Sequence, residues 1–225
     1  DLENKLPDEI EHIYPDYSLY PELTKDTAYG WLTRGCPRCN HSSFCITPEK
    51  DGRKSVKVAD LSEFWDGQKN IVLCDPNILA CKQWKELLQQ LIDSKAWVDF
   101  NQGLDIRLMT EEKAEMIKRI KTKNIHFAWD QYSDLEKIVP KFREFKEITG
   151  IGYQKLGVYV LCGFDTTIEQ DLERIYTLRD LGYSPYVMLY NKDSIPRGHT
   201  LRKMQRYVNN RFIFAKCKTF EEYQG

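Results

Sequence analysis

The sequence lacks the features that would place the chain in a membrane-spanning, fibrous or disordered class. No apolar run approaches the roughly 18 residues of a membrane span, and no low-complexity tract or short repeat is visible. The chain also lacks an excess of charge, since 33 Lys and Arg residues oppose 34 Asp and Glu residues for a net charge of −1. This balance argues against the broad basic field of a nonspecific DNA-binding protein.

The start of the chain lacks the character of a signal peptide, because residues 1–5 (Asp-Leu-Glu-Asn-Lys) are polar and acidic. It also lacks a methionine, the first being Met109, so we expect a processed product or an excised domain. Cysteine is scarce and odd in number, at seven residues. That count is unlike a secreted disulfide scaffold and favours a reducing cytoplasm.

What is present is enough chain for one soluble globular domain, with 225 residues of which 41% are hydrophobic and 30% charged. Residues 1–29 show no clear period, and Pro15 and Pro21 predict an extended lead-in or linker. From residue 30 to residue 225, strand and helix patterns alternate. We predict strands at 29–33, 71–74, 97–100, 124–129, 156–162 and 186–190, and helices at 84–92, 110–120, 135–145, 168–181 and 201–208.

This alternation favours a parallel α/β fold. The predicted strands are continuous apolar runs without polar alternation, as in parallel strands buried on both faces. An eight-unit barrel takes about 250 residues, so the residues after the lead-in supply about six β/α units. We predict a partial (β/α)6 TIM-type barrel. An open doubly wound sheet competes with it, but no Gly-x-Gly-x-x-Gly or Walker-type loop supports a nucleotide-binding version.

Polar residues follow the predicted strands at their carboxyl ends. In a parallel fold, the loops at these ends converge on one mouth, where function is located. Each such residue alone could be an ordinary polar loop residue, but the set predicts a functional mouth. Its members are Arg34, Cys36, Asp75, Asn77, Asn101, Gln102, Asp105, Asp130, Asp165 and Asn191.

The loop after the first predicted strand carries three cysteines within ten residues, Cys36, Cys39 and Cys45. Clustered thiols in a reducing compartment indicate a soft metal, and three ligands leave one metal position open for chemistry. A zinc site with His41 as the fourth ligand competes with this interpretation. Its spacing is poor, because a single residue separates Cys39 from His41 and no second Cys-x2-Cys pair occurs.

The loop resembles the cluster loop of the radical S-adenosylmethionine (radical SAM) superfamily. The similarity lies in Thr-Arg-Gly-Cys-Pro-Arg at 33–38, Phe-Cys at 44–45, and the Pro- and Lys-containing acidic turn at 48–52. That superfamily has a six-unit partial β/α barrel with the cluster on the loop after the first strand. The Tyr-Pro-Asp-Tyr-Ser segment at 14–18 resembles the linker after an N-terminal cobalamin-binding-type domain. The resemblance therefore implies a barrel core from which such a domain has been removed.

The cysteine spacing departs from the superfamily pattern. The usual spacing is Cys-x3-Cys-x2-Cys, whereas this chain has Cys-x2-Cys-x5-Cys. Either Cys39 is the second ligand in a loop that is two residues longer, or the site is altered. Cys36 and Cys45 are the firmer ligands, and His41 is an alternative to Cys39.

The resemblance implies both cofactors and a reaction. Three thiolates hold a [4Fe–4S] cluster that binds SAM, and an electron from a reductant such as flavodoxin or ferredoxin cleaves SAM to methionine and a 5′-deoxyadenosyl radical. The radical abstracts hydrogen from a substrate that the sequence does not specify, and the open side of a partial barrel suits a large one. The implied SAM-binding residues are Phe44 at the adenine, Asp75 and Asn77 at the amino group, Gln102, Asp105 and Arg107 at the ribose and carboxylate, and Asp130 at the next strand end.

Other interpretations stay open at this point. The chain could be a noncatalytic zinc-binding or interaction module on a degenerate barrel that has lost the cluster, and Asp105 and Arg107 could be a surface pair at a helix start. Cys74 is a candidate catalytic thiol, whereas Cys162 is expected in the core. The basic stretches 118–123 and 197–211 are expected to be solvated helix faces, so nucleic acid is not indicated.

Overall fold

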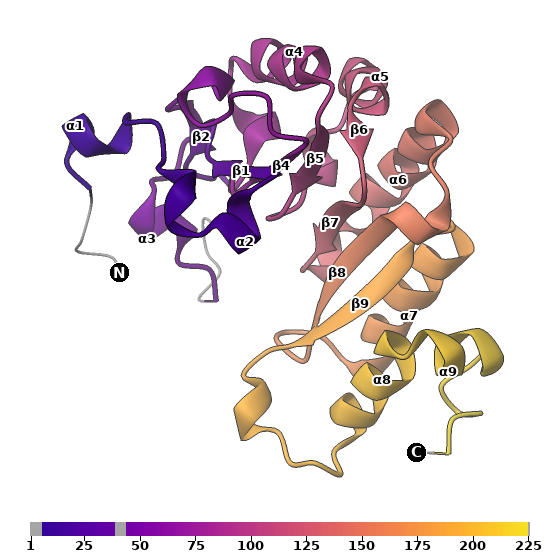
Figure 1. The fold of residues 1–225 in the computed structure, drawn as a ribbon. Helices are drawn as coiled ribbons and strands as arrows, with labels where there is room; N and C mark the ends of the chain where they lie inside the picture. The colour runs from indigo at the N-terminus through magenta and orange to yellow at the C-terminus, as the bar shows by residue number, and fades with distance from the viewer. Residues whose placement is uncertain (1–5, 39–43, 225) are drawn as a thin grey trace. The chain divides into compact units, whose positions relative to one another are not determined.

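The computed structural model describes residues 6–38 and 44–224. The chain divides into two compact units, 1–125 and 126–225, each with its own parallel sheet (Figure 1). The predicted α/β class with parallel strands is therefore confirmed. Within the described residues, every helix is too short or too polar to cross a membrane.

The first unit contains a four-stranded sheet in which the strand order follows the chain order, β1-β4-β5-β6. Each neighbouring pair is parallel, with Ala28 opposite Ile71 and Ile71 opposite Val98 in the register. These three side chains are buried, so one face of the sheet forms the core of the unit. The strands are β1 (Thr27–Gly30), β4 (Asn70–Leu73), β5 (Trp97–Phe100) and β6 (Lys121–Thr122).

Helices α4 and α5 of this unit pack against each other through their apolar faces. Leu87, Leu88 and Leu91 are buried on α4, at the helical spacing that the sequence shows. The hydroxyl of Thr110 accepts a hydrogen bond from the backbone N–H of Lys113, which confirms Thr110 as the N-cap of α5. The helices are α1 (Asp8–Glu11), α2 (Pro21–Thr24), α3 (Thr47–Lys50), α4 (Trp84–Ser94) and α5 (Glu111–Arg119).

The predicted strand at 29–33 is wrong in its bounds, because the chain leaves the parallel sheet after Gly30. The carboxylate of Asp75 accepts hydrogen bonds from the backbone N–H groups of Leu32 and Thr33, so a side chain takes the place of a neighbouring strand there. The chain then forms β2 (Thr33–Arg34), which pairs antiparallel with β3 (Val56–Lys57).

The second unit contains a three-stranded sheet of order β7-β8-β9, with β8 and β9 parallel. Helix α7 packs against β8 and β9, and α8 packs against β9. Phe127, Phe142 and Phe145 form an edge-to-face aromatic cluster in the core. The elements are β7 (Ile125–Trp129), α6 (Leu135–Thr149), β8 (Leu156–Cys162), α7 (Ile168–Asp180), β9 (Ser184–Leu189), α8 (Thr200–Asn209) and α9 (Arg211–Lys216).

The strands bury one face more completely than the other. In β8, Val158, Val160 and Cys162 are fully buried, whereas the alternate positions Tyr159 and Leu161 are half-buried. The expectation of complete burial on both faces is therefore not met within this unit. Short 3₁₀ turns connect the elements at η1 (Tyr17–Leu19), η2 (Leu61–Glu63), η3 (Ile78–Ala80), η4 (Ile106–Leu108), η5 (Tyr132–Asp134), η6 (Tyr153–Lys155) and η7 (Lys192–Ser194).

Candidate functional site

The first predicted ligand, Cys36, follows β2, and a backbone hydrogen bond fixes its position. Its N–H donates to the carbonyl of Gly52 at 3.1 Å. Gly35 has φ +85°, and a Cβ at this position would lie 2.1 Å from the carbonyl oxygen of Lys54. Glycine is required here for both the backbone angle and the close approach, so the start of the cysteine loop is fixed against residues 52–54.

The sulfur of Cys36 accepts two N–H hydrogen bonds. The side-chain amide Nδ2 of Asn77 lies 3.5 Å from the Cys36 Sγ, and the backbone N of Arg38 lies 3.4 Å from it. Cys36 is buried, with 6% of its surface exposed. A neutral thiol is a weak acceptor, whereas thiolates and metal-bound sulfurs attract N–H donors. The Cys36 sulfur is therefore contacted by N–H donors of the kind that metal-bound sulfurs attract.

Asn77 connects this sulfur to a buried carboxylate. Its Nδ2 also donates to the Asp105 Oδ2 at 3.1 Å, and its backbone carbonyl accepts a hydrogen bond from the hydroxyl of Ser55. Asn77 is only 2% exposed, and its Oδ1 has no hydrogen-bond partner among the described residues. A buried amide oxygen without a partner is costly in a folded protein, so it marks a place where a ligand donor would be favourable.

Asp105 is a buried carboxylate that binds the side chain of Arg107. The Arg107 Nε and Nη2 donate to its two oxygens at 3.0 and 2.8 Å. Burial acts to raise the pKa of Asp105, but the Arg107 guanidinium, the charge of Arg38 and the amide of Asn77 outweigh it, and the pKa lies below its ordinary value. Asp105 and Arg107 do form a pair at the start of η4, as one interpretation of the sequence had it, but Asp105 is buried and not at the surface.

Asp75 fixes the approach to the cysteine loop. Besides the N–H groups of Leu32 and Thr33, its carboxylate accepts the Thr33 hydroxyl at 2.7 Å. Burial raises the pKa of Asp75 to about 6, although these hydrogen bonds act in the opposite direction. Because three donors already occupy the carboxylate, its main structural role is to hold the segment that leads to Cys36.

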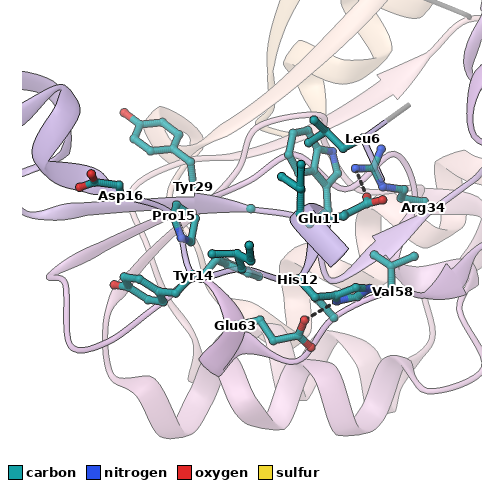
Figure 2. Close-up of a pocket in the computed structure, with 16 residues that line it drawn as sticks. Leu6, Glu11, His12, Tyr14, Pro15, Asp16, Tyr29, Arg34, Val58 and Glu63 are labelled. Carbon is teal, nitrogen blue, oxygen red and sulfur yellow. Dashed lines mark hydrogen bonds and ion pairs between the residues drawn. The ribbon is translucent and has the colours of Figure 1, made fainter. Parts of the chain in front are cut away.

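Arg34, from the Thr-Arg-Gly-Cys-Pro motif, is covered by the N-terminal segment. Its guanidinium lies 2.5 Å from Glu11 and 3.4 Å from Asp51, and it sits over the Trp31 ring. Figure 2 shows Arg34 and Glu11 facing each other beside a cavity of about 430 Å³ that the N-terminal segment forms with β1. Two ion pairs therefore line this cavity, Arg34 with Glu11 and His12 with Glu63, the latter at 2.6 Å.

The remaining predicted site residues are not all brought together. Cys45 and Phe44 are half-buried, and Gln102 is exposed. Asp130 belongs to the second unit, which is described by itself. Cys39 and the alternative ligand His41 lie outside the described residues. Within 6–38 and 44–224, no group of three His, Cys, Asp or Glu side chains has the arrangement of a metal site.

Two cysteines outside the loop, Cys74 and Cys162, have environments that oppose thiolate formation. Burial, together with the charges of Asp75 and Asp99, raises the pKa of Cys74. Burial and the charge of Asp171 raise the pKa of Cys162, which is fully buried in β8 as expected for a core residue. Protonated thiols are poor metal ligands, so Cys74 and Cys162 are unsuited to that role.

The second unit has a polar group of a different kind at its strand ends. Asp171 and Arg174 on α7 are both completely buried and form an ion pair at 2.5 Å. The Arg174 guanidinium donates to the carbonyls of Trp129 at the end of β7 and Leu161 near the end of β8, each at 2.7 Å. Asp171 accepts from the backbone N–H of Gly163. The pair therefore fixes the strand ends and the loops that follow them.

Sequence reasoning missed several of these residues. Arg38 and Thr33 lie in the motif itself. The Arg38 N–H contacts Cys36 only two residues away, whereas the contact of Thr33 with Asp75 joins positions 42 residues apart in the chain. Asp171 and Arg174 lie three residues apart on a helix, which by pattern is typical of an exposed ion pair. Their position on the apolar face, beside Leu172 and Ile175, was the available signal.

A scan against models of protein families found no match for this chain, and a search of curated proteins found none either.

Proposed function

We propose that the chain is the core of a radical SAM enzyme, which binds a [4Fe–4S] cluster and SAM and generates a 5′-deoxyadenosyl radical for hydrogen abstraction from a substrate. The observation that carries the proposal is the Cys36 sulfur, which is buried and accepts N–H hydrogen bonds from Asn77 and Arg38. Hydrogen bonds to cysteine sulfurs are a principal means by which proteins tune iron–sulfur clusters.

The described residues fit such a group. Cys36 and Cys45 are free cysteines of the loop, and Cys39 would be the third ligand. The partnerless Oδ1 of Asn77 lies in the residue that donates to Cys36, so it could accept a hydrogen bond from the amino group of SAM. When bound, the cluster and SAM would supply one-electron cleavage of a C–S bond, which no side chain can perform.

The chain's own residues would bind and orient. Asp75 holds the backbone of residues 32–33, and Gly35 holds the loop start, so Cys36 has a fixed position. Asp105 and Arg107 neutralise each other while keeping Asn77 in place through its Nδ2. The half-buried aromatic ring of Phe44, directly before Cys45, would cover one side of the adenine.

The fold supports the same proposal. In the first sheet, and again in the second, the strand order follows the chain order without the reversal that defines a doubly wound sheet. This order favours the singly wound partial (β/α)6 barrel. We further propose that the protein acts in the reducing cytoplasm with a flavodoxin- or ferredoxin-type reductant, since the six described cysteines are all free.

Anaerobic reconstitution tests the proposal. The purified chain is incubated with iron and sulfide, and its iron, sulfide and zinc contents are then measured. We expect about four iron and four sulfide per chain, an absorption band near 400 nm, and release of methionine and 5′-deoxyadenosine from SAM after reduction.

Two cysteine variants make the assignment specific. Cys36→Ala should bind little iron, whereas Cys162→Ala, which removes a core thiol, should bind as much iron as the wild type. One zinc per chain without sulfide would overturn the proposal in favour of a zinc-binding module. Full iron content in Cys36→Ala would overturn the ligand assignment.

A further inference from the structure

The second unit contains a cavity of about 670 Å³ that the proposed function does not use. It lies where β8 and β9 begin, at the opposite end of these strands from the loops after Cys162 and Leu189. Its walls come from the end of α6, the turn η6, the start of β9 and helices α8 and α9. Small-molecule sites have volumes of about 300–1,000 Å³, so the cavity has the size of a ligand site.

The charge of the cavity has one sign. Lys146, Arg179 and Arg211 line it, and the described lining residues include no Asp or Glu. Arg179 forms an ion pair at 3.3 Å with Asp180, which does not line the cavity and whose side chain is 71% exposed. A concave surface with three cations focuses a positive potential, so the cavity favours an anionic ligand.

Two of these cations are already held in place. The Lys146 Nζ donates to the carbonyls of Leu181 and Gly182 at 3.0 and 2.8 Å. The Arg179 guanidinium stacks on the Tyr176 ring and donates to the carbonyl of Lys218. Arg211 is exposed, and its side chain makes no hydrogen bond or ion pair within residues 6–38 and 44–224. Arg211 is therefore the cation with donors left for a ligand.

The cavity also presents flat apolar surface and open space. Tyr153 is 59% exposed, and the Phe214 ring lies beneath the Arg179 guanidinium at 5.6 Å. Gly152 has an ordinary φ of −68°, and a Cβ there would meet no atom within 4 Å. Aromatic rings beside a positive potential are suited to a planar ring that carries a phosphate.

We propose that this cavity binds a nucleoside phosphate, with Arg211 at the phosphate and Tyr153 against the base. The site is independent of the proposed cluster, because all of its residues belong to the second unit. Arg211 would form a charge-assisted hydrogen bond with the phosphate, and Tyr153 would order as the base stacks on it.

Calorimetric titration of the full chain with ADP tests this proposal, with adenosine and inorganic phosphate as separate titrants. We expect ADP to bind at least about tenfold more tightly than either part alone, since both halves of the cavity contribute. Arg211→Gln should weaken ADP binding about tenfold. Lys203→Gln, an exposed change on α8 outside the cavity, should leave the affinity within about twofold.

Gly152→Leu provides a second variant that fills the cavity without backbone strain, and it should abolish ADP binding. Gly198→Leu is its matched control, because Gly198 is also exposed, has open space around it and lies outside the cavity. The SAM site of the proposed function would also accept an adenosine group. ADP binding that survives both Arg211→Gln and Gly152→Leu would therefore overturn the proposal, as would the absence of ADP binding at millimolar concentration.

Discussion

The two units carry buried polar groups near the carboxyl ends of their strands, and these groups differ in what their hydrogen bonds bind. In the second unit, Asp171 and Arg174 are completely buried, and they bind each other and the carbonyls at the strand ends, with only the Arg174 Nε lacking a partner among the described residues. In the first unit, Asn77 keeps a buried oxygen without a partner among the described residues, and its amide donates to the Cys36 thiol.

We interpret the first kind of group as structural and the second as part of the proposed site. A buried network whose main groups bind each other and the backbone holds strand ends in place and leaves little for a ligand. A network that directs donors to a sulfur and leaves an acceptor unused is stable only because the surrounding fold imposes it. The comparison predicts that changes in the second unit act on stability, whereas changes around Cys36 act on the properties of the sulfur.

The largest expected effect is the loss of the buried ion pair. Arg174→Met should lower the free energy of unfolding by about 3–5 kcal/mol, because it leaves the Asp171 carboxylate buried without its partner. Urea denaturation measures the loss. The double variant Asp171→Leu with Arg174→Met should recover part of it. A loss below about 1 kcal/mol in Arg174→Met would show that the pair does not hold the second unit together.

A smaller effect is expected from the titration of Asp75. Its pKa of about 6 in the folded chain lies above the value of about 3.9 in unfolded chains, so the folded state binds the proton more tightly. The stability that this proton contributes is present at low pH and is lost as the pH rises through about 6. Relative to Asp75→Asn, the wild type should therefore lose about 2 kcal/mol between pH 4 and pH 7.

Urea denaturation of the wild type and Asp75→Asn at several pH values between 4 and 7.5 checks this prediction. Other titrating groups cancel in the difference between the two proteins. A difference that is constant with pH would mean that burial of the Asp75 carboxyl does not raise its pKa.

Removal of one donor to Asp75 should have a moderate effect. Thr33→Val keeps the branched shape but loses the hydroxyl that donates to the carboxylate at 2.7 Å. We expect a loss of about 2 kcal/mol in the free energy of unfolding at pH 7, since hydrogen bonds to charged groups contribute about 1.5–3 kcal/mol. Thr27→Val on β1, where the residue is only half-buried, is the control and should change stability by less than 1 kcal/mol.

The smallest effect on stability, and the most specific to the sulfur, is expected from Asn77→Ala. Loss of the N–H donor to Cys36 should lower the reduction potential of the reconstituted chain by on the order of 50 mV, which corresponds to about 1 kcal/mol for one electron. Protein film voltammetry measures the shift. In the chain without metal, the same change should alter the rate of alkylation of Cys36 at neutral pH, because its sulfur loses one of two N–H donors. Unchanged potential and unchanged alkylation would remove Asn77 from the proposed site.

Much of the fold is predictable because burial imposes local patterns. The strands at 97–100 and 156–162 coincide with β5 and β8, since each is an apolar run that ends at a turn. The N-cap at Thr110 was also predictable from its side-chain chemistry. The pairing of β2 with β3 was not, because two-residue strands have no periodicity and their partners lie about 20 residues apart.

The candidate site was predictable in its members but not in their connections. Cys36, Asn77 and Asp105 all follow strands, and polar residues at these positions predict a site. Their contacts depend on which loops the parallel sheet brings together, and those separations are 41 and 28 residues. The burial of Arg174 was likewise not predictable from the sequence, since a charged residue on a helix is exposed in most proteins.

The anchoring of the cysteine loop at its start has a consequence for how the loop can change in length. Gly35 and Cys36 are fixed by the backbone of residues 52–54, and α3 begins at Thr47, so extra residues between these points need not disturb the sheet. The entropy of loop closure grows only with the logarithm of length. Two more residues between the first and last cysteines of the loop therefore cost about 0.3 kcal/mol. An unusual cysteine spacing is then a thermodynamically inexpensive variation, which the proposed site can accommodate.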